Sequence, residues 1–176
     1  MTLIKINDNY WLECEYIASG STAIVYEIKD TNNVLALVSS YFDTMRDAIA
    51  DKIANEGIID HVPQIERLGY ARKEGSQEVF KAYRMPKYNV LDFNSMDPIL
   101  AYLDIAIDRP GKFDIYQYLH DLKDDMFIEH SIILAIEWIY NAISTDETNY
   151  KPDILGDNLA YDNNGQLILL DIFHNF

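Results

Sequence analysis

The sequence has one cysteine, few basic residues and no long apolar run. The single Cys14 excludes an intramolecular disulfide and a zinc site built on several thiolates. Met1 to Asn9 lacks a basic start followed by an apolar stretch, so no signal peptide is expected. The longest notable apolar run is Ile132 to Ile136, against roughly 18 residues needed to cross a bilayer. We therefore expect a soluble, cytoplasmic protein that does not bind a membrane.

Basic residues are scarce: the 176 residues include 14 Lys or Arg against 29 Asp or Glu, for a formal net charge of −15. This charge would repel a nucleic-acid backbone and an anionic membrane surface. A nucleotide ligand is not excluded, because a bound metal ion reverses the local charge. Hydrophobic residues make up 49% of the chain, which excludes a disordered protein. The length allows one domain or two small lobes, at about 150 residues per domain.

The first half of the sequence indicates a sheet with one helix. Apolar and β-branched residues gather in short runs that turn residues separate, as is typical of strands. A helix follows the third run, starting at Asp43 or Thr44, with Met45, Ile49 and Ile53 four residues apart. The expected strands are Tyr10–Ala18, Ile24–Ile28, Val34–Val38, Gln64–Tyr70 and Glu78–Met85.

The second half indicates helices followed by one hairpin. Ser95 can cap a helix that reaches Ile107, and helices are also expected over 113–122 and 127–143. The last expected element is a hairpin whose strands are Asn158 to Tyr161 and Leu167 to Ile172. Its turn contains Asn-Gly, which is typical of tight hairpins.

Two segments carry residue types suited to phosphate chemistry. The loop between the first two strands contains Ser19, Gly20 and Ser21, and small residues let backbone N–H groups approach phosphate oxygens. By itself, this loop is better explained as a small-residue hairpin turn. Asp153 and Asn158 are five residues apart, and the terminal hairpin is expected to return Asp171 to the same end of the two strands. An aspartate that accepts a proton, beside an Asn and an Asp on one magnesium ion, is typical of phosphoryl transfer.

In the order and approximate spacing of these segments, the chain resembles the protein-kinase-like superfamily, and most of all the small kinases encoded by bacteriophages. Ile17 to Tyr26 resembles the glycine-rich loop, and Asp43 to Ile59 resembles helix C. Tyr83 to Pro86 resembles the hinge, Asp153 to Ala160 the catalytic loop, and Asp171 to Phe173 the metal-binding Asp-Phe-Gly segment.

The resemblance implies an α+β fold of two lobes. Residues 1–85 would form an N-lobe with a five-stranded antiparallel sheet and one helix. Residues 86–176 would form a truncated, mainly helical C-lobe with the catalytic hairpin.

The resemblance also implies a site for ATP and magnesium. Asp153 would be the catalytic base that orients the acceptor hydroxyl, and Asn158 and Asp171 would hold magnesium. Met85 and its neighbours would meet the adenine. The nucleotide would lie against residues of the glycine-rich segment: Ala18, Ser19, Gly20, Ser21, Thr22 and Val25.

Three departures from the family bear on activity. The lysine that the family carries on its third strand is missing, since neither Ala36 nor Val38 supplies a charge. Lys52 and Lys81 are the candidates to replace it, although the default for each is a solvated surface lysine. The family's helix-C glutamate has no clear counterpart either: Glu56 falls late in the helix and Asp51 is shorter, and a lost lysine makes such a partner unnecessary. Only five residues follow Asp171, so the segments with which the family binds peptide substrates are missing from this sequence.

These departures leave three readings of the function. The first is a minimal phosphotransferase that uses ATP and magnesium, with weak or degenerate activity. The second is a pseudokinase that binds and inhibits a host protein without catalysis. The third is an acidic decoy that imitates a nucleic acid on a basic protein. Nucleotide binding separates the first reading from the third, and turnover separates the first from the second.

Overall fold

In the computed structural model the chain forms two compact units. The first contains Met1–Gly57 and Gln64–Lys87, and the second contains Ile58–Pro63 and Tyr88–Phe176. The helix expected from Ser95 to Ile107 lies outside the described residues. In the part of the chain that the structure describes, no helix is long and apolar enough to cross a membrane. The structure describes residues 1–20, 23–39, 45–91, 115–124, 128–144, 150–152 and 158–175.

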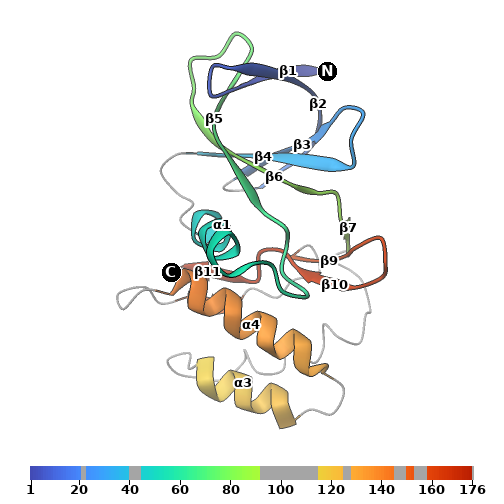
Figure 1. Ribbon diagram of the computed structural model, residues 1–176, viewed down its shortest axis with the longest axis vertical. Coiled ribbons are helices and arrows are strands. Elements are labelled where there is room, and N and C mark those ends of the chain that lie inside the picture. The colour runs from blue at the N-terminus through green and yellow to red at the C-terminus, as the bar shows by residue number, and fades with distance from the viewer. Residues whose placement is uncertain are drawn as a thin grey trace. The chain divides into compact units, whose positions relative to one another are not determined.

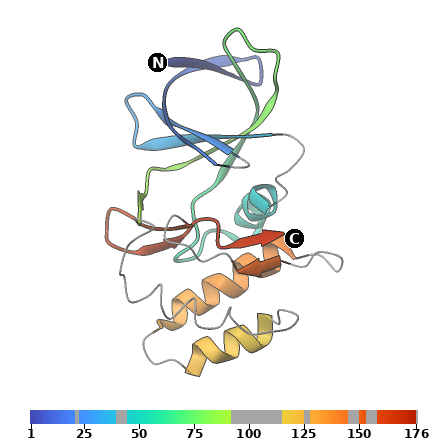
Figure 2. The same ribbon diagram turned by 180° about the vertical axis from the view of Figure 1, so that it is seen from behind.

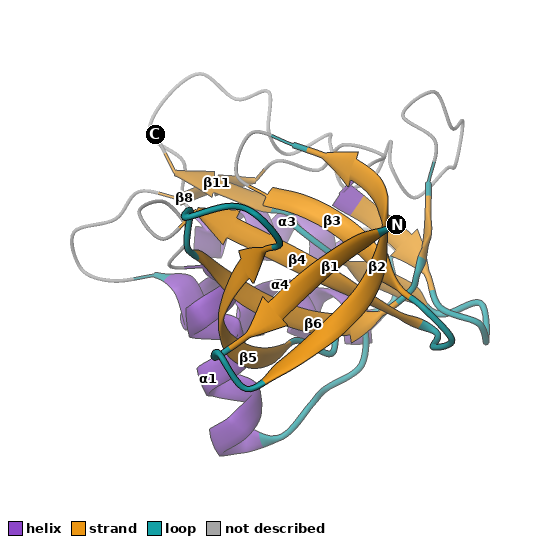
Figure 3. Ribbon diagram, turned by 90° about the horizontal axis from the view of Figure 1, so that it is seen from above, coloured by secondary structure: helices purple, strands orange, loops and turns teal. Residues whose placement is uncertain are grey.

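The first unit is built on a closed antiparallel β-barrel (Figures 1 and 3). Its strands follow one another around the barrel in the order β1-β2-β3-β4-β6-β5, and β1 pairs with β5 to close it. Five of these strands lie within a few residues of the ranges expected from the sequence. The strands are β1 (Thr2–Ile6), β2 (Tyr10–Ser19), β3 (Ala23–Ile28), β4 (Asn33–Ser39), β5 (Glu66–Lys73) and β6 (Phe80–Pro86).

The expectation of a five-stranded sheet was wrong, because the barrel has a sixth strand, β1. Ile4 and Ile6 are fully buried and flank the partly exposed Lys5, which is the alternation of a half-buried strand. This signal was present in the sequence but covers only a few residues. β1 forms antiparallel ladders with both β2 and β5, so it leaves no free edge between those two strands.

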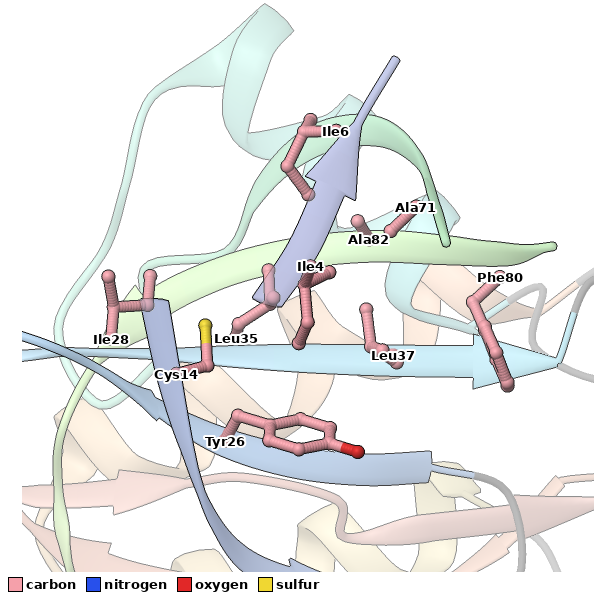
Figure 4. Close-up of a cluster of buried hydrophobic side chains, with 10 residues drawn as sticks. All are labelled: Ile4, Ile6, Cys14, Tyr26, Ile28, Leu35, Leu37, Ala71, Phe80 and Ala82. Carbon is pink, nitrogen blue, oxygen red and sulfur yellow. The ribbon is translucent and has the colours of Figure 1, made fainter. Parts of the chain in front are cut away.

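The barrel interior is filled by apolar side chains that alternate along the strands (Figure 4). Cys14 belongs to this cluster, and burial raises the pKa of its thiol to about 11. The thiol is therefore neutral at physiological pH and serves as a small apolar group. The cluster consists of Ile4, Ile6, Cys14, Tyr26, Ile28, Leu35, Leu37, Ala71, Phe80 and Ala82.

Asn7 and Gly69 secure the closure between β1 and β5. A bulge interrupts β5 between Arg67 and Gly69, and Gly69 has a φ of +105°. The Asn7 side chain donates to the Leu68 carbonyl and accepts from the Tyr70 N–H at 2.8 Å. The Asn7 N–H also donates to the Tyr70 carbonyl at 2.8 Å, so one residue binds three backbone groups of β5 next to the bulge.

The first unit also contains the helix α1 (Met45–Glu56), which confirms the helix expected in this region. The second unit contains α3 (Ile115–Asp124) and α4 (His130–Ile143), which lie side by side in Figures 1 and 2. One face of α4 is buried, with isoleucine at most of its positions: Ile132, Ile133, Ala135, Ile136, Ile139 and Ile143.

The second unit has more strands than the one hairpin expected. That hairpin is present as β9–β10, and β7 adds a third strand beside β9. A separate two-stranded sheet joins β8 and β11. These strands are very short, and their partners are far away in the sequence, so periodicity did not reveal them. Their bounds are β7 (Asn89–Val90), β8 (Tyr150–Pro152), β9 (Leu159–Tyr161), β10 (Leu167–Leu169) and β11 (Phe173–Asn175).

We predict that Gly69→Ala destabilises the barrel by about 1–3 kcal/mol from backbone strain alone. An L-residue rarely adopts the observed φ, and an added Cβ would lie 2.3 Å from Asn7 Oδ1. Urea unfolding monitored by tryptophan fluorescence measures the change.

Gly20→Ala is the matched control for this substitution. A Cβ at Gly20 would meet no atom within 4 Å, and no positive φ is found there. We expect Gly20→Ala to change the unfolding free energy by less than about 1 kcal/mol. An equal loss in both variants would contradict the role assigned to the Asn7–Gly69 closure.

Candidate functional site

The loop that resembles a glycine-rich loop joins β2 to β3. Ala18 and Ser19 end β2, where they pair with Val25 and Ile24 of β3. The Gly20 N–H donates to the Ala23 carbonyl at 2.9 Å. Ser21 and Thr22 lie outside the described residues. The space around Gly20 is open, so neither packing nor backbone conformation requires a glycine there.

Four neighbouring strands, β2, β3, β4 and β6, carry small or apolar side chains on the outer face of the barrel, which is the face opposite to its interior. Val25 pairs with Ala18 on one side and with Ala36 on the other, so the three share this face. Val34 of β4 pairs with Met85 of β6, so these two side chains also belong to the outer face. The residues that the resemblance assigns to the nucleotide base thus lie on one face of the first unit.

The Asp47 carboxylate, in the first turn of α1, binds three donors from the barrel. It accepts from Lys81 Nζ at 2.6 Å and from Tyr83 Oη at 2.8 Å, both on β6. Arg67 Nη2 of β5 lies 2.7 Å from Asp47 Oδ1, the oxygen that also accepts from Tyr83, and Arg67 Nη1 lies 3.1 Å from Asp51 Oδ1. These five residues, with Gly69 and Tyr70, line a pocket of about 360 Å³.

Two pKa shifts reflect this cluster. Burial raises the pKa of Asp47, but the hydrogen bonds from Lys81 and Tyr83 and the charge of Arg67 outweigh it, so the net pKa is lowered. Burial lowers the pKa of Arg67, but its hydrogen bond to Asp51 and the charges of Asp47 and Asp51 raise it overall. Asp47 is therefore ionised and Arg67 is protonated at neutral pH.

Sequence reasoning missed Asp47 as the acidic partner on the helix. It considered Glu56 and Asp51, but Glu56 pairs with Lys52 of the same helix at 2.7 Å, and Asp51 pairs with Arg67. An acidic residue in the first turn of a helix is common, because it complements the helix dipole. Asp47 therefore carried no distinctive signal until the strand register placed Lys81 and Tyr83 beside it.

In the second unit, the terminal hairpin brings the segments of Asn158 and Asp171 together. Asn158 immediately precedes β9, and its carbonyl accepts a hydrogen bond from the Leu170 N–H at 2.9 Å. Asp171 follows Leu170, and both Asn158 and Asp171 are partly buried. Asp153 lies outside the described residues. Within the described ranges, no three His, Cys, Asp or Glu side chains come close enough to hold a metal ion.

His61 fixes the returning strand of this hairpin. Its side chain is buried, with Nδ1 2.7 Å from the Leu167 carbonyl and Nε2 3.0 Å from Ser131 Oγ of α4. Its carbonyl accepts from the Leu169 N–H at 2.8 Å. Its φ of +65° is uncommon for a residue other than glycine. In the sequence His61 was one of four scattered histidines, so nothing distinguished it as an anchor of β10.

The solved structures to which the chain is similar include two phosphotransferases. No family model and no curated protein matches the sequence. The chain is similar to spectinomycin phosphotransferase APH(9)-Ia, solved in complex with ADP and spectinomycin, with 12% identity and a TM-score of 0.42. That match covers 93% of this chain but only 65% of the phosphotransferase, which is less than two thirds of its length. Aminoglycoside phosphotransferase APH(4)-Ia is similar at 10% identity and a TM-score of 0.39, over 92% of this chain and 68% of that one.

We predict that Asp47→Asn destabilises the first unit by about 1–2 kcal/mol at pH 7, a value reduced for partial exposure. The folded-state pKa of Asp47 lies below its unfolded value, so its stabilising contribution is present above the unfolded pKa near 4. That contribution is lost as the pH falls through the folded-state pKa. Urea unfolding between pH 7 and pH 2.5 should therefore show native and variant proteins converging in stability at the acid end.

Asp51→Asn is the matched control, one helical turn further along α1. The Asp51 side chain is 63% exposed, and among the described contacts its partner is Arg67 at 3.1 Å. We expect Asp51→Asn to lower the free energy of unfolding by less than about 0.5 kcal/mol at pH 7. If Asp51→Asn lowers the free energy of unfolding as much as Asp47→Asn does, the cluster is not centred on Asp47.

Proposed function

We propose that this chain is a kinase-like phosphotransferase that binds ATP with magnesium and transfers the phosphoryl group slowly. The observation that carries the proposal is the hydrogen bond from the Leu170 N–H to the Asn158 carbonyl. This bond brings two parts of the chain to one end of the β9–β10 hairpin. One contains Asn158, with its amide, and the other contains Asp171, with its carboxylate. Asn158 and Asp171 are the residue types that hold the metal in this class of reaction.

The chemistry of the two side chains suits magnesium. This cation prefers oxygen ligands and keeps several water molecules, so it is usually bound through one or two protein groups and the substrate phosphates. Asn158 offers an amide oxygen and Asp171 offers carboxylate oxygens. When bound, the metal ion neutralises charge on the phosphate oxygens.

The first unit supports the nucleotide half of the proposal. The outer face of the barrel carries two partly exposed apolar side chains, Val25 of β3 and Met85 of β6. The β2–β3 loop beside it has open space at Gly20, where backbone N–H groups can approach an anion without side-chain obstruction. Asp153 is proposed as the base that accepts the proton of the acceptor hydroxyl and orients it for attack.

Slow transfer follows from the composition of β4. Val34, Leu35, Ala36, Leu37 and Val38 are all buried and apolar, so this strand contributes no charge to the phosphates. Phosphoryl transfer depends on positioning and on stabilisation of phosphate charge. Losing one well-placed stabilising group typically costs about 100- to 1000-fold in rate.

The proposal predicts that ATP binding depends on magnesium and on Asp171. Calorimetric titration of the native chain with ATP should show binding that EDTA weakens at least about tenfold, because metal–phosphate contacts are lost. Asp171→Asn, which keeps the shape but not the charge, should remove the magnesium dependence.

Glu129→Gln is the control for that loss of charge, because Glu129 is exposed and its side chain makes no cap hydrogen bond at the start of α4. Glu129→Gln should leave ATP binding unchanged, both in the titration with magnesium and in the titration with EDTA. Release of ADP from labelled ATP, measured in parallel, tests transfer without a known acceptor. Binding without any ADP release would favour a kinase-like protein that binds but does not catalyse. No ATP binding at all would reject the proposal.

A further inference from the structure

We infer that the outer surface of β2, β1 and β5 binds an acidic peptide segment of a partner protein. Four side chains form this surface, here called the Trp11 patch: Trp11 of β2, Lys5 of β1, and Tyr70 and Arg72 of β5. β1 lies between β2 and β5, and β4 is three strands away from β1 in either direction around the barrel (Figure 3). The patch is therefore on the side of the barrel opposite to β4, and the inference does not depend on the proposed function.

The strand register places the four side chains on one surface. Lys5 pairs with Trp11 on one side and with Arg72 on the other. Directly paired residues of antiparallel strands point to the same face, so these three form a row across the strands. Ala71, which lies between Tyr70 and Arg72 on β5, is buried in the barrel, so both of its neighbours point outward.

The two cations of the patch are only weakly neutralised. Lys5 Nζ and Arg72 Nη1 both lie 3.8 Å from the same oxygen, Asp8 Oδ1, which is too far for a hydrogen bond. Six other cations of the first unit each have a carboxylate oxygen at 2.5–2.7 Å. Lys5 and Arg72 differ from these in carrying charge that an external carboxylate can bind. The six are Lys29, Lys52, Arg67, Lys81, Arg84 and Lys87.

Two exposed aromatic rings flank the cations. Trp11 is 49% exposed and Tyr70 is 60% exposed, although aromatic side chains usually bury most of their surface. Lys5 Nζ lies over the Trp11 ring, 5.7 Å from its centroid, and this contact helps to hold the ring in place. A hollow of about 40 Å³ beside Lys5, Asp8, Tyr70 and Arg72 has room for a group little larger than one water molecule. It can admit a carboxylate, while the rings contact apolar side chains next to it.

This combination suits an acidic peptide better than a nucleic acid. Arginine binds carboxylates through two parallel hydrogen bonds, and tryptophan, tyrosine and arginine are the residues that most often dominate protein interfaces. Single-stranded nucleic acid also binds aromatic and cationic surfaces, but it needs a continuous positive groove and open ring faces. Here Asp8 lies beside both cations, and Lys5 covers one face of Trp11. The net charge of −15 also repels a long polyanion more strongly than a peptide with two carboxylates.

The test compares a synthetic acidic peptide, acetyl-Phe-Glu-Asp-Leu-amide, with its uncharged counterpart, acetyl-Phe-Gln-Asn-Leu-amide. Binding to the isotope-labelled native chain is followed by NMR titration at about 0.15 M salt, where charge repulsion is screened beyond about 8 Å. The acidic peptide should shift the indole N–H signal of Trp11 but not that of Trp138, which lies on α4 in the second unit. The uncharged peptide should bind at least about fivefold more weakly, because it cannot pair with Lys5 and Arg72.

Two variants with the same change of charge assign the binding to the patch. Arg72→Gln should weaken binding of the acidic peptide at least about fivefold, as is typical of an arginine that dominates an interface. Lys29→Gln is the matched control, because Lys29 is also on the barrel surface but is held by Glu13 at 2.5 Å. It should leave the affinity unchanged within about twofold. Thermal melts verify that both variants are folded.

A third variant should strengthen binding. Asp8→Asn removes the carboxylate that competes with the peptide for Lys5 and Arg72. Asp8 has a φ of +58°, which asparagine also adopts readily, so the turn between β1 and β2 is kept. The acidic peptide should bind Asp8→Asn at least about twofold more tightly than the native chain, because one repulsive charge is gone. Unchanged or weaker binding would show that Asp8 does not compete for the cations, and would overturn the inference.

The remaining outcomes are equally decisive. No shift of Trp11 with the acidic peptide, or equal affinity for the charged and uncharged peptides, overturns the inference. Equal losses in Arg72→Gln and Lys29→Gln would show that overall charge, and not the patch, controls binding. Tighter binding of a short oligothymidine strand than of the acidic peptide would identify a nucleic-acid surface in place of the one inferred. ATP binding is measured separately, so the failure of this inference leaves the proposed function standing, and the reverse also holds.

Discussion

The ion pair between Asp47 and Lys81 is the interaction on which the candidate site of the first unit depends. It joins the start of α1 to β6, and the same carboxylate binds Tyr83 and Arg67. A carboxylate with three donors from two strands cannot shift without leaving several polar groups unsatisfied. The position of the helix against the barrel, the depressed pKa of Asp47 and the placement of the Lys81 ammonium therefore share one cause.

The closed barrel gives this cluster a rigid base. β1 covers what would otherwise be two free strand edges, and Asn7 satisfies the backbone at the bulge where Gly69 bends β5. The bulge separates Arg67, which faces Asp47, from Gly69, which accommodates Asn7. One irregularity in one strand thus serves both the closure of the barrel and the charge cluster on its outer face.

Local patterns in the sequence were sufficient for most elements. Alternating apolar residues revealed β2 to β6, helical spacing revealed α1 and α4, and the Asn-Gly turn revealed the β9–β10 hairpin. β1 was missed because only Ile4 and Ile6 carry its pattern. The short strands β7, β8 and β11 were missed because each is stabilised by a partner distant in sequence, which local periodicity cannot report.

The sequence by itself determined the residue types of the candidate site: an amide and carboxylates near a terminal hairpin, small residues in a loop, and no lysine on β4. Only the tertiary structure decided which charges meet. Asp47 and Lys81 are 34 residues apart, and they meet because the barrel places β6 beside β5, the strand that α1 contacts. His61 acquires its role from contacts 70 and 106 residues away. Such contacts depend on strand order and register, which arise from closing the whole barrel and packing the helices, and no short stretch of sequence encodes them.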